Sequence, residues 1–124
     1  MTSSNPNIRN GSTRSGSHHW WMQRLSAVAL IPLSLWFMSV LVWMPLQDYE
    51  RLLIWMSELT HAVPLLVMVA ALIYHASLGM QVVLEDYISH HGLKLSLIFL
   101  TKFIFIVLGV VSILSISKVY FLLS

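Results

Sequence analysis

Three long apolar stretches, almost free of charged residues, constrain this 124-residue chain more than any other feature of its sequence. They run from about residue 25 to 46, from 59 to 84 and from 95 to 117, and Lys102 is the one charged residue inside them. A helix of about 20 apolar residues crosses a hydrocarbon layer roughly 30 Å thick, and it satisfies its own backbone hydrogen bonds in lipid. The sequence therefore predicts an all-α fold, an integral membrane bundle of three transmembrane helices.

The composition agrees with a protein that lives in membrane lipid. Hydrophobic residues make up 57% of the chain and charged residues 10%, whereas soluble domains have roughly 25% charged residues. The formal net charge of +2 is too weak a basic balance to indicate nucleic acid as a partner. The sequence has no cysteine, so it excludes disulfides, thiol catalysis and iron–sulfur ligation by this chain.

The N-terminal segment differs from the rest in composition. Residues 1–17 are rich in Ser, Asn and Gly, and Met1 and Ile8 are their only large apolar residues. Such a segment buries too little apolar surface to order itself. We therefore predict a disordered tail over residues 1–17 and a membrane-anchor domain over residues 18–124.

The positions of Lys and Arg predict the orientation in the membrane. Arg9, Arg14 and Arg24 precede or begin the first span, and Lys94 lies between the second and third spans. Basic residues favour the inner side of a membrane. We expect a multi-pass protein with its N-terminus inside, in the cytoplasm or the matrix, and its C-terminus outside.

His75 is an ionisable residue near the middle of the second span, where such residues are functional candidates. Ala71 and Gly79 lie one turn before and one turn after it on the same helix face. This small-residue face indicates either close helix packing or clearance for a flat macrocycle such as haem, with His75 as an axial ligand. His61 lies about 21 Å away along the same helix, so a second axial ligand would come from another chain.

A second polar cluster, Glu85-Asp86-Tyr87, ends the same span. Asp86 follows His75 by close to three full helical turns, so the two residues share a face. A phenol at the headgroup level can donate a hydrogen bond to a carbonyl, with a neighbouring carboxylate to orient it or relay protons. The alternative is an interfacial Tyr beside solvated acids. Arg24 is either a topology-setting charge or the partner of a ligand carboxylate at the same depth.

Two motifs in these regions resemble a known family. The run from His75 to Tyr87 has the pattern H-x3-G-x6-D-Y, and residues 17–24 read SHHWWMQR. Both are similar to the small hydrophobic membrane-anchor subunit of succinate dehydrogenase, the cytochrome b-type D subunit. The resemblance covers roughly residues 17 to 90, while the third span is generic.

The resemblance implies roles for five residues. His75 matches the axial ligand to the iron of haem b, and Tyr87 matches the tyrosine that hydrogen-bonds ubiquinone. Asp86 matches the aspartate that supports the ubiquinone site. Arg24 matches an arginine near the haem propionates and the quinone pocket. His18 falls near a family histidine at the same mouth, although the doublet with His19 leaves its register open.

The resemblance also implies a function and partners. The chain would be a non-catalytic anchor of succinate:ubiquinone oxidoreductase (complex II), passing electrons to quinone in the tricarboxylic acid cycle and the respiratory chain. Its partners would be a second transmembrane anchor subunit of cytochrome b type, an iron–sulfur subunit and a flavoprotein subunit. The location would be a bacterial or mitochondrial inner membrane. Alternatives are a fumarate reductase anchor, a small multihelix transporter or proton-relay subunit, and an assembly subunit without cofactor.

Overall fold

The structure, a computed structural model, describes residues 10–44 and 48–124, with side chains from residue 16 onward. Within these ranges the chain forms four α-helices. They are α1 (Asn10–Trp43), α2 (Tyr49–Ser57), α3 (Leu59–Tyr87) and α4 (His91–Leu123). Three helical stretches are long and apolar enough to cross a membrane, namely Gly16–Trp43, Leu59–Tyr87 and His91–Leu123. The predicted all-α fold with three membrane spans is therefore confirmed.

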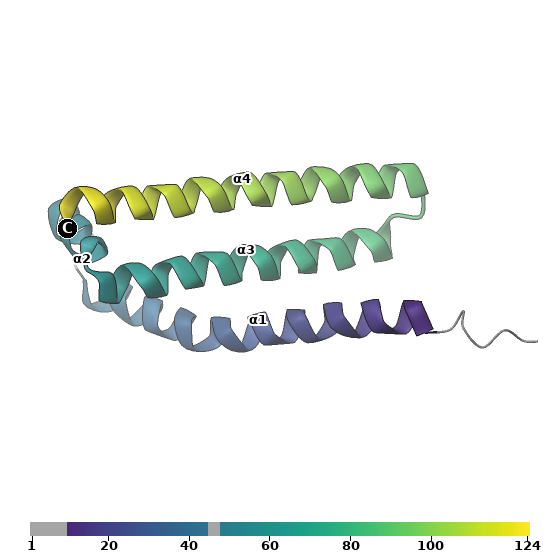
Figure 1. Cartoon of the computed structure of the whole chain (residues 1–124), viewed down its shortest axis with the longest axis horizontal. Helices are drawn as coiled ribbons and strands as arrows, with labels where there is room; N and C mark the ends of the chain where they lie inside the picture. Colours follow the sequence, from purple (N-terminus) through teal and green to yellow (C-terminus); the bar gives the residue numbers. More distant parts are fainter. Residues whose placement is uncertain (1–9, 45–47) are drawn as a thin grey trace, which may run out of the picture.

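The three long helices lie side by side with α3 between α1 and α4 (Figure 1). The N-terminal end of α1 and the α3–α4 connection lie at one end of the bundle, and α2 and the C-terminus lie at the other. Below, the first is called the N-terminal end and the second the C-terminal end. This alternation is the one that three successive spans require.

The first helix begins earlier than the sequence-based boundary. Helix α1 starts at Asn10, so residues 10–17 of the segment expected to be disordered are helical, while residues 1–9 lie outside the described part. Nucleation is the costly step of helix formation, and each further residue adds one hydrogen bond to a helix already formed. The apolar span that follows thus supports a helical extension that the polar composition did not predict.

The connection between the first two spans holds the short helix α2, which the sequence analysis treated as a loop. Asp48 is its N-cap residue, and its side chain accepts a hydrogen bond from the Arg51 backbone N–H at 3.2 Å. An Arg51–Asp48 ion pair of 2.9 Å lies on the same turn. Short polar side chains at this position satisfy backbone donors that the first helical turn leaves free. A capping signal inside a charged connection was therefore present in the sequence.

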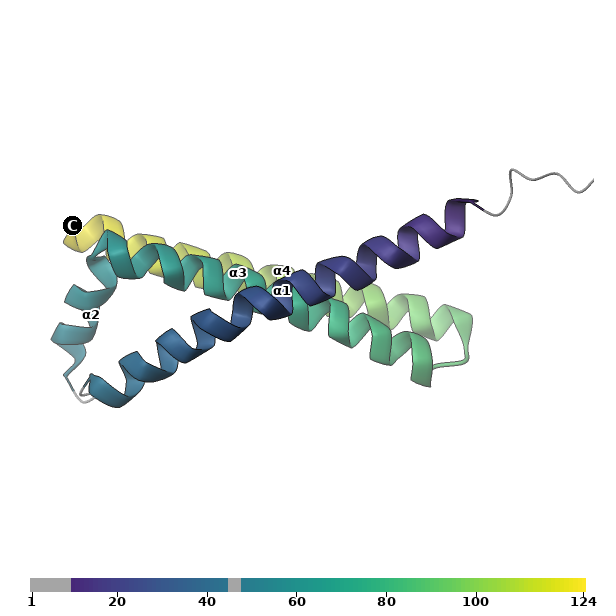
Figure 2. The same ribbon diagram turned by 90° about the horizontal axis from the view of Figure 1, so that it is seen from below.

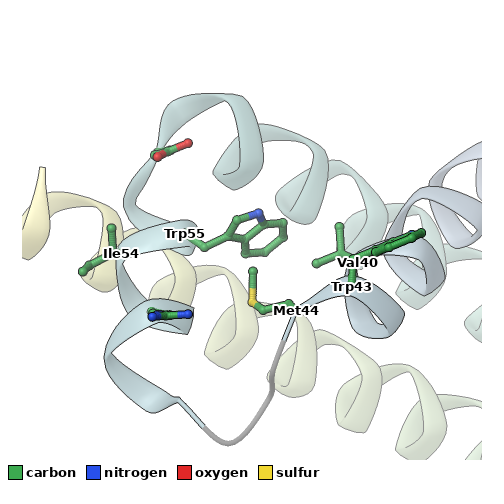
Figure 3. Close-up of a pocket in the computed structure, with 7 residues that line it drawn as sticks. Val40, Trp43, Met44, Ile54 and Trp55 are labelled. Atoms are coloured by element: carbon green, nitrogen blue, oxygen red, sulfur yellow. The ribbon is translucent and has the colours of Figure 1, made fainter.

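Helix α2 and the end of α1 line an open, largely apolar pocket of about 460 Å³ at the C-terminal end (Figure 3). Trp55 projects into it from α2, opposite Val40, Trp43 and Met44 at the end of α1. The Trp55 ring also stacks on Trp36 at 5.8 Å between centroids. Aromatic stacking thus fixes α2 against the first span.

The contact between α3 and α4 depends on a small residue. Gly109 of α4 is buried, and a Cβ atom built on it would lie 3.6 Å from Cγ2 of Ile73 in α3. The missing side chain lets the two backbones approach closely, as small residues do in membrane bundles.

Little of the chain is buried within the chain itself. Among the described residues the buried hydrophobic side chains are Ala62, Leu65 and Ile116, whereas many large apolar side chains on all three spans are exposed. An exposed apolar surface of this extent requires lipid or a partner subunit to cover it. The exposed apolar side chains are therefore covered by partner subunits of a larger membrane assembly or by lipid.

Candidate functional site

Helix α1 crosses α3 obliquely near the middle of both helices (Figure 2). At this crossing Oγ of Ser26 lies 3.0 Å from Nδ1 of His75. Ser26 is the one buried polar residue of the described part of the chain, with 8% of its surface exposed. His75 is half-buried, and its ring is directed toward α1 instead of away from the bundle.

A cavity of about 280 Å³ adjoins His75 on the α1 side. Its other lining residues come from about two turns of α1 and are Trp20, Gln23, Arg24 and Ala27. The Arg24 guanidinium lies over the Trp20 ring, 4.4 Å from its centroid. This cation–π contact holds a positive charge at the rim of the cavity that His75 lines. The structure therefore brings together His75 and Arg24, two of the predicted site residues.

The helix face around His75 leaves open space. A Cβ atom added to Gly79, one turn after His75, would meet nothing within 4 Å. Gly79 therefore serves no close contact within this chain, in contrast to Gly109. On the Gly79 side of His75, this chain therefore leaves open space.

A larger cavity of about 540 Å³ lies between α1 and α3 toward the N-terminal end. Gln81 and Glu85 line it from α3, and His19 and Gln23 line it from α1. The Gln81 Nε2 group donates to Oε1 of Glu85 at 2.8 Å, which leaves the Gln81 Oε1 atom buried without a hydrogen-bond partner in the described part. The N-terminal end thus carries a polar recess that adjoins the cavity beside His75, with Trp20 and Gln23 lining both.

The other predicted site residues are not gathered into these cavities. Tyr87 is 85% exposed, and Asp86 is exposed beside it at the end of α3. His18 is exposed and packs edge-on against His19 at 6.3 Å, and it is His19 that lines the larger cavity. Within this chain alone, His18, Asp86 and Tyr87 therefore form an open surface at the N-terminal end.

A comparison with known proteins identifies the family. The family model described as succinate dehydrogenase/fumarate reductase transmembrane subunit matches residues 2–116. The chain belongs to this family. It is 41% identical over 102 residues to the succinate dehydrogenase hydrophobic membrane anchor subunit of Rickettsia bellii, covering 82% of this chain and 81% of that protein.

Two further relatives agree with this assignment. The protein of the same description from Rickettsia conorii is 39% identical over 98 residues, or 78% of each chain. The succinate dehydrogenase membrane anchor subunit of Reclinomonas americana is 30% identical over 95 residues, or 74% of this chain and 79% of that protein. The resemblance drawn from the sequence motifs is therefore confirmed at the level of the family. Membership of this transmembrane-subunit family implies that the chain forms a complex with other subunits.

Two histidine-containing regions of this family member remain distinct. Nδ1 of His61 contacts the Trp55 carbonyl and Oε2 of Glu58, each at 3.1 Å, and its ring stacks on Trp55 at 4.5 Å. These contacts hold His61 at the C-terminal end, away from His75. Lys102 lines a third cavity between α3 and α4, of about 330 Å³, and its side chain is exposed.

Sequence reasoning missed three polar residues of the site, Gln23, Ser26 and Gln81. The hydroxyl of Ser26 lies two residues beyond Arg24, inside the first apolar span. A comparison of depths, with Arg24 and Glu85 as markers of the same end, would not have paired the two residues, because Ser26 lies two residues and His75 ten residues inward of its marker. To identify the residue that faces His75, one must know the angle at which α1 crosses α3, and the sequence pattern does not give this angle.

Proposed function

We propose that this chain is a non-catalytic membrane anchor of succinate:ubiquinone oxidoreductase, and that His75 supplies one axial ligand of haem b. The observation that carries the proposal is the half-buried His75, whose Nδ1 atom is engaged by Ser26 beside a cavity rimmed by Arg24. In the part of the chain that the structure describes, no cluster of three or more His, Asp or Glu side chains could hold a metal ion. A ligand set completed by a partner subunit agrees with that absence.

The donor set of this chain fits haem. An imidazole nitrogen is a common axial ligand, and bound haem would supply a one-electron carrier in the membrane. The open space at Gly79 would admit the edge of a flat ring, and the guanidinium of Arg24 would pair with a propionate. The residues that line the cavity of about 280 Å³ beside His75 would form one side of the haem site, and a second transmembrane anchor subunit would form the other side.

The exposed N-terminal end would face the iron–sulfur and flavoprotein subunits on the inner side of a bacterial or mitochondrial inner membrane. There the Tyr87 hydroxyl would donate a hydrogen bond to a ubiquinone carbonyl, and Asp86 would orient it or supply protons. The 85% exposure of Tyr87 leaves its hydroxyl free for a ligand that other subunits enclose. The succinate dehydrogenase names of the relatives favour this direction of reaction over fumarate reduction.

A proton-relay role finds less support in the contacts. A relay along α3 would need groups that connect His75 with His61, yet His75 bonds to Ser26 and His61 bonds to the Trp55 carbonyl. Hydrogen-bonded groups aimed at different neighbours do not form a chain.

The proposal is tested on the purified complex by reduced-minus-oxidised optical spectra of the wild type, His75→Ala and His61→Ala. We expect His75→Ala to alter or remove the b-type spectrum, because the iron loses one of its two axial ligands. The control His61→Ala removes an imidazole from the same helix and should leave the spectrum unchanged. An unaltered spectrum in His75→Ala would remove the ligand role.

A further inference from the structure

The hydrogen bonds around Ser26 determine where the proton of His75 lies. The Ser26 Oγ–H group donates to the backbone carbonyl of Gln23 at 2.8 Å. A serine hydroxyl has a single proton and two acceptor lone pairs. With the Ser26 proton on the Gln23 carbonyl, the Ser26 oxygen accepts from His75, whose Nδ1 atom lies 3.0 Å away; with the hydroxyl turned toward His75, the donor and acceptor of this contact are exchanged.

The bond of Ser26 to the Gln23 carbonyl favours one tautomer of the imidazole. A neutral imidazole carries one N–H group, so a protonated Nδ1 leaves Nε2 with its lone pair. No residue of the described part hydrogen-bonds Nε2 of His75, and this atom is not among the buried atoms lacking a partner. The nitrogen free to bind a metal is therefore Nε2.

We propose that Ser26 is a positioning residue that holds His75 in the Nδ1–H tautomer and presents Nε2 as the metal-binding nitrogen. The inference rests on the proposed haem-ligand role of His75. Metal-binding histidines commonly donate their second ring N–H to an oxygen, which fixes the ring orientation and raises the basicity of the ligand nitrogen. Here the acceptor comes from α1, so the packing of α1 against α3 determines the orientation of the His75 ring.

The surroundings make this hydrogen bond important. Ser26 is 8% exposed, so water is largely excluded from the position that its hydroxyl occupies. An imidazole N–H without a partner is costly in an apolar environment, and both tautomers would then compete. The bond of the hydroxyl to the Gln23 carbonyl directs the Ser26 proton away from His75, which favours Ser26 as the acceptor.

The test compares Ser26→Ala and Ser26→Thr in the purified complex, with Ser39→Ala as the matched control. Ser39 donates to the Trp36 carbonyl at 2.6 Å, the same local bond that Ser26 makes, but it is exposed and has no bond to a histidine. Haem content, haem affinity, the haem reduction potential and the low-temperature electron paramagnetic resonance spectrum are measured for each variant.

We expect Ser26→Ala to weaken haem binding by roughly 10–100-fold, the usual effect of losing such an outer partner. The reduction potential should rise, because a less basic ligand stabilises the oxidised iron less. The resonance spectrum should change with the orientation of the imidazole. Ser26→Thr keeps a hydroxyl that bonds to the preceding turn, so it should restore the wild-type values, and Ser39→Ala should match wild type throughout.

The outcomes separate this inference from the proposed function. An unchanged spectrum in His75→Ala would overturn both. A changed spectrum in His75→Ala together with wild-type affinity, potential and resonance spectrum in Ser26→Ala would overturn the role of Ser26 alone. Should Ser26→Ala lower the yield of complex, the potential of the assembled fraction still decides, since it reports on intact sites. A Ser26→Thr variant that behaves like Ser26→Ala would also overturn the proposal.

Discussion

Gly79 follows His75 by one turn of α3, and a Cβ atom at Gly79 would meet nothing of this chain within 4 Å. The open space therefore lies on the same face of α3 as His75. A glycine with no neighbour to accommodate is unusual in a packing face, where the small residue lets a second helix approach. The space at Gly79 is better explained by a group that this chain does not contribute.

Filling that space should displace haem without harming the chain. We predict that Gly79→Leu lowers the haem bound per complex, with an affinity roughly 5–150-fold weaker, because forcing bulk into a filled site costs about 1–3 kcal/mol. The chain should still insert and assemble. Haem content is measured by the pyridine haemochrome spectrum, and subunit stoichiometry is measured on the same sample.

Ala70→Leu is the control for added bulk on the same helix. Ala70 is exposed and lines the separate pocket of about 330 Å³ between α3 and α4, so a larger side chain there can extend outward without crowding His75. Haem content should therefore stay at the wild-type level in Ala70→Leu. Full haem occupancy in Gly79→Leu would show that the face beside His75 serves another purpose.

Substitution of Gly109 by leucine should lower the stability of the complex, whereas substitution of Gly79 by leucine should lower its haem content. A Cβ atom at Gly109 lies at an ordinary contact distance of 3.6 Å from Ile73, so Gly109→Ala should be tolerated. The further atoms of leucine would force α3 and α4 apart, so Gly109→Leu should destabilise the complex by about 1–3 kcal/mol. The thermal unfolding midpoint of the purified complex measures both. Equal midpoints for Gly109→Leu and wild type would contradict the close approach.

The sequence predicts the spans well because hydrocarbon thickness and backbone hydrogen bonding leave few alternatives to a helix of about 20 apolar residues. It predicts His75 as a site residue because an imidazole at that depth is costly unless it has a role. It does not predict Ser26 opposite His75, since the pairing depends on how α1 crosses α3. It also does not predict α2, a nine-residue helix that lies outside the apolar stretches from which the spans were predicted.

The cap at Asp48 offers a test of α2 that is independent of cofactors. We predict that Asp48→Ala destabilises α2 by roughly 1 kcal/mol, because it removes the acceptor of the Arg51 backbone N–H. A change of this size corresponds to about fivefold faster opening of the helix. Hydrogen–deuterium exchange of residues 49–57 in the detergent-solubilised complex measures it.

Glu50→Ala is the control for the cap. Glu50 is an acidic residue in the first turn of α2 but does not occupy the N-cap position. Its removal should change exchange less than the removal of Asp48, since an exposed charge near a helix terminus contributes about 0.3 kcal/mol once salt screens it, the low end of the usual range. Equal exchange in Asp48→Ala and Glu50→Ala would leave the cap without a measurable role.

Tyr87 lies at the end of α3 with 85% of its surface exposed, where its hydroxyl is available to a ligand held by several subunits. We predict that Tyr87→Phe lowers kcat/KM for ubiquinone reduction about fivefold, since a neutral hydrogen bond contributes about 1 kcal/mol. Succinate oxidation with an artificial electron acceptor should be unchanged, because it does not need the quinone site. Tyr49→Phe removes the same hydroxyl from an exposed tyrosine at the C-terminal end and should leave both activities intact. An equal loss of both activities in Tyr87→Phe would instead place Tyr87 in the assembly of the complex.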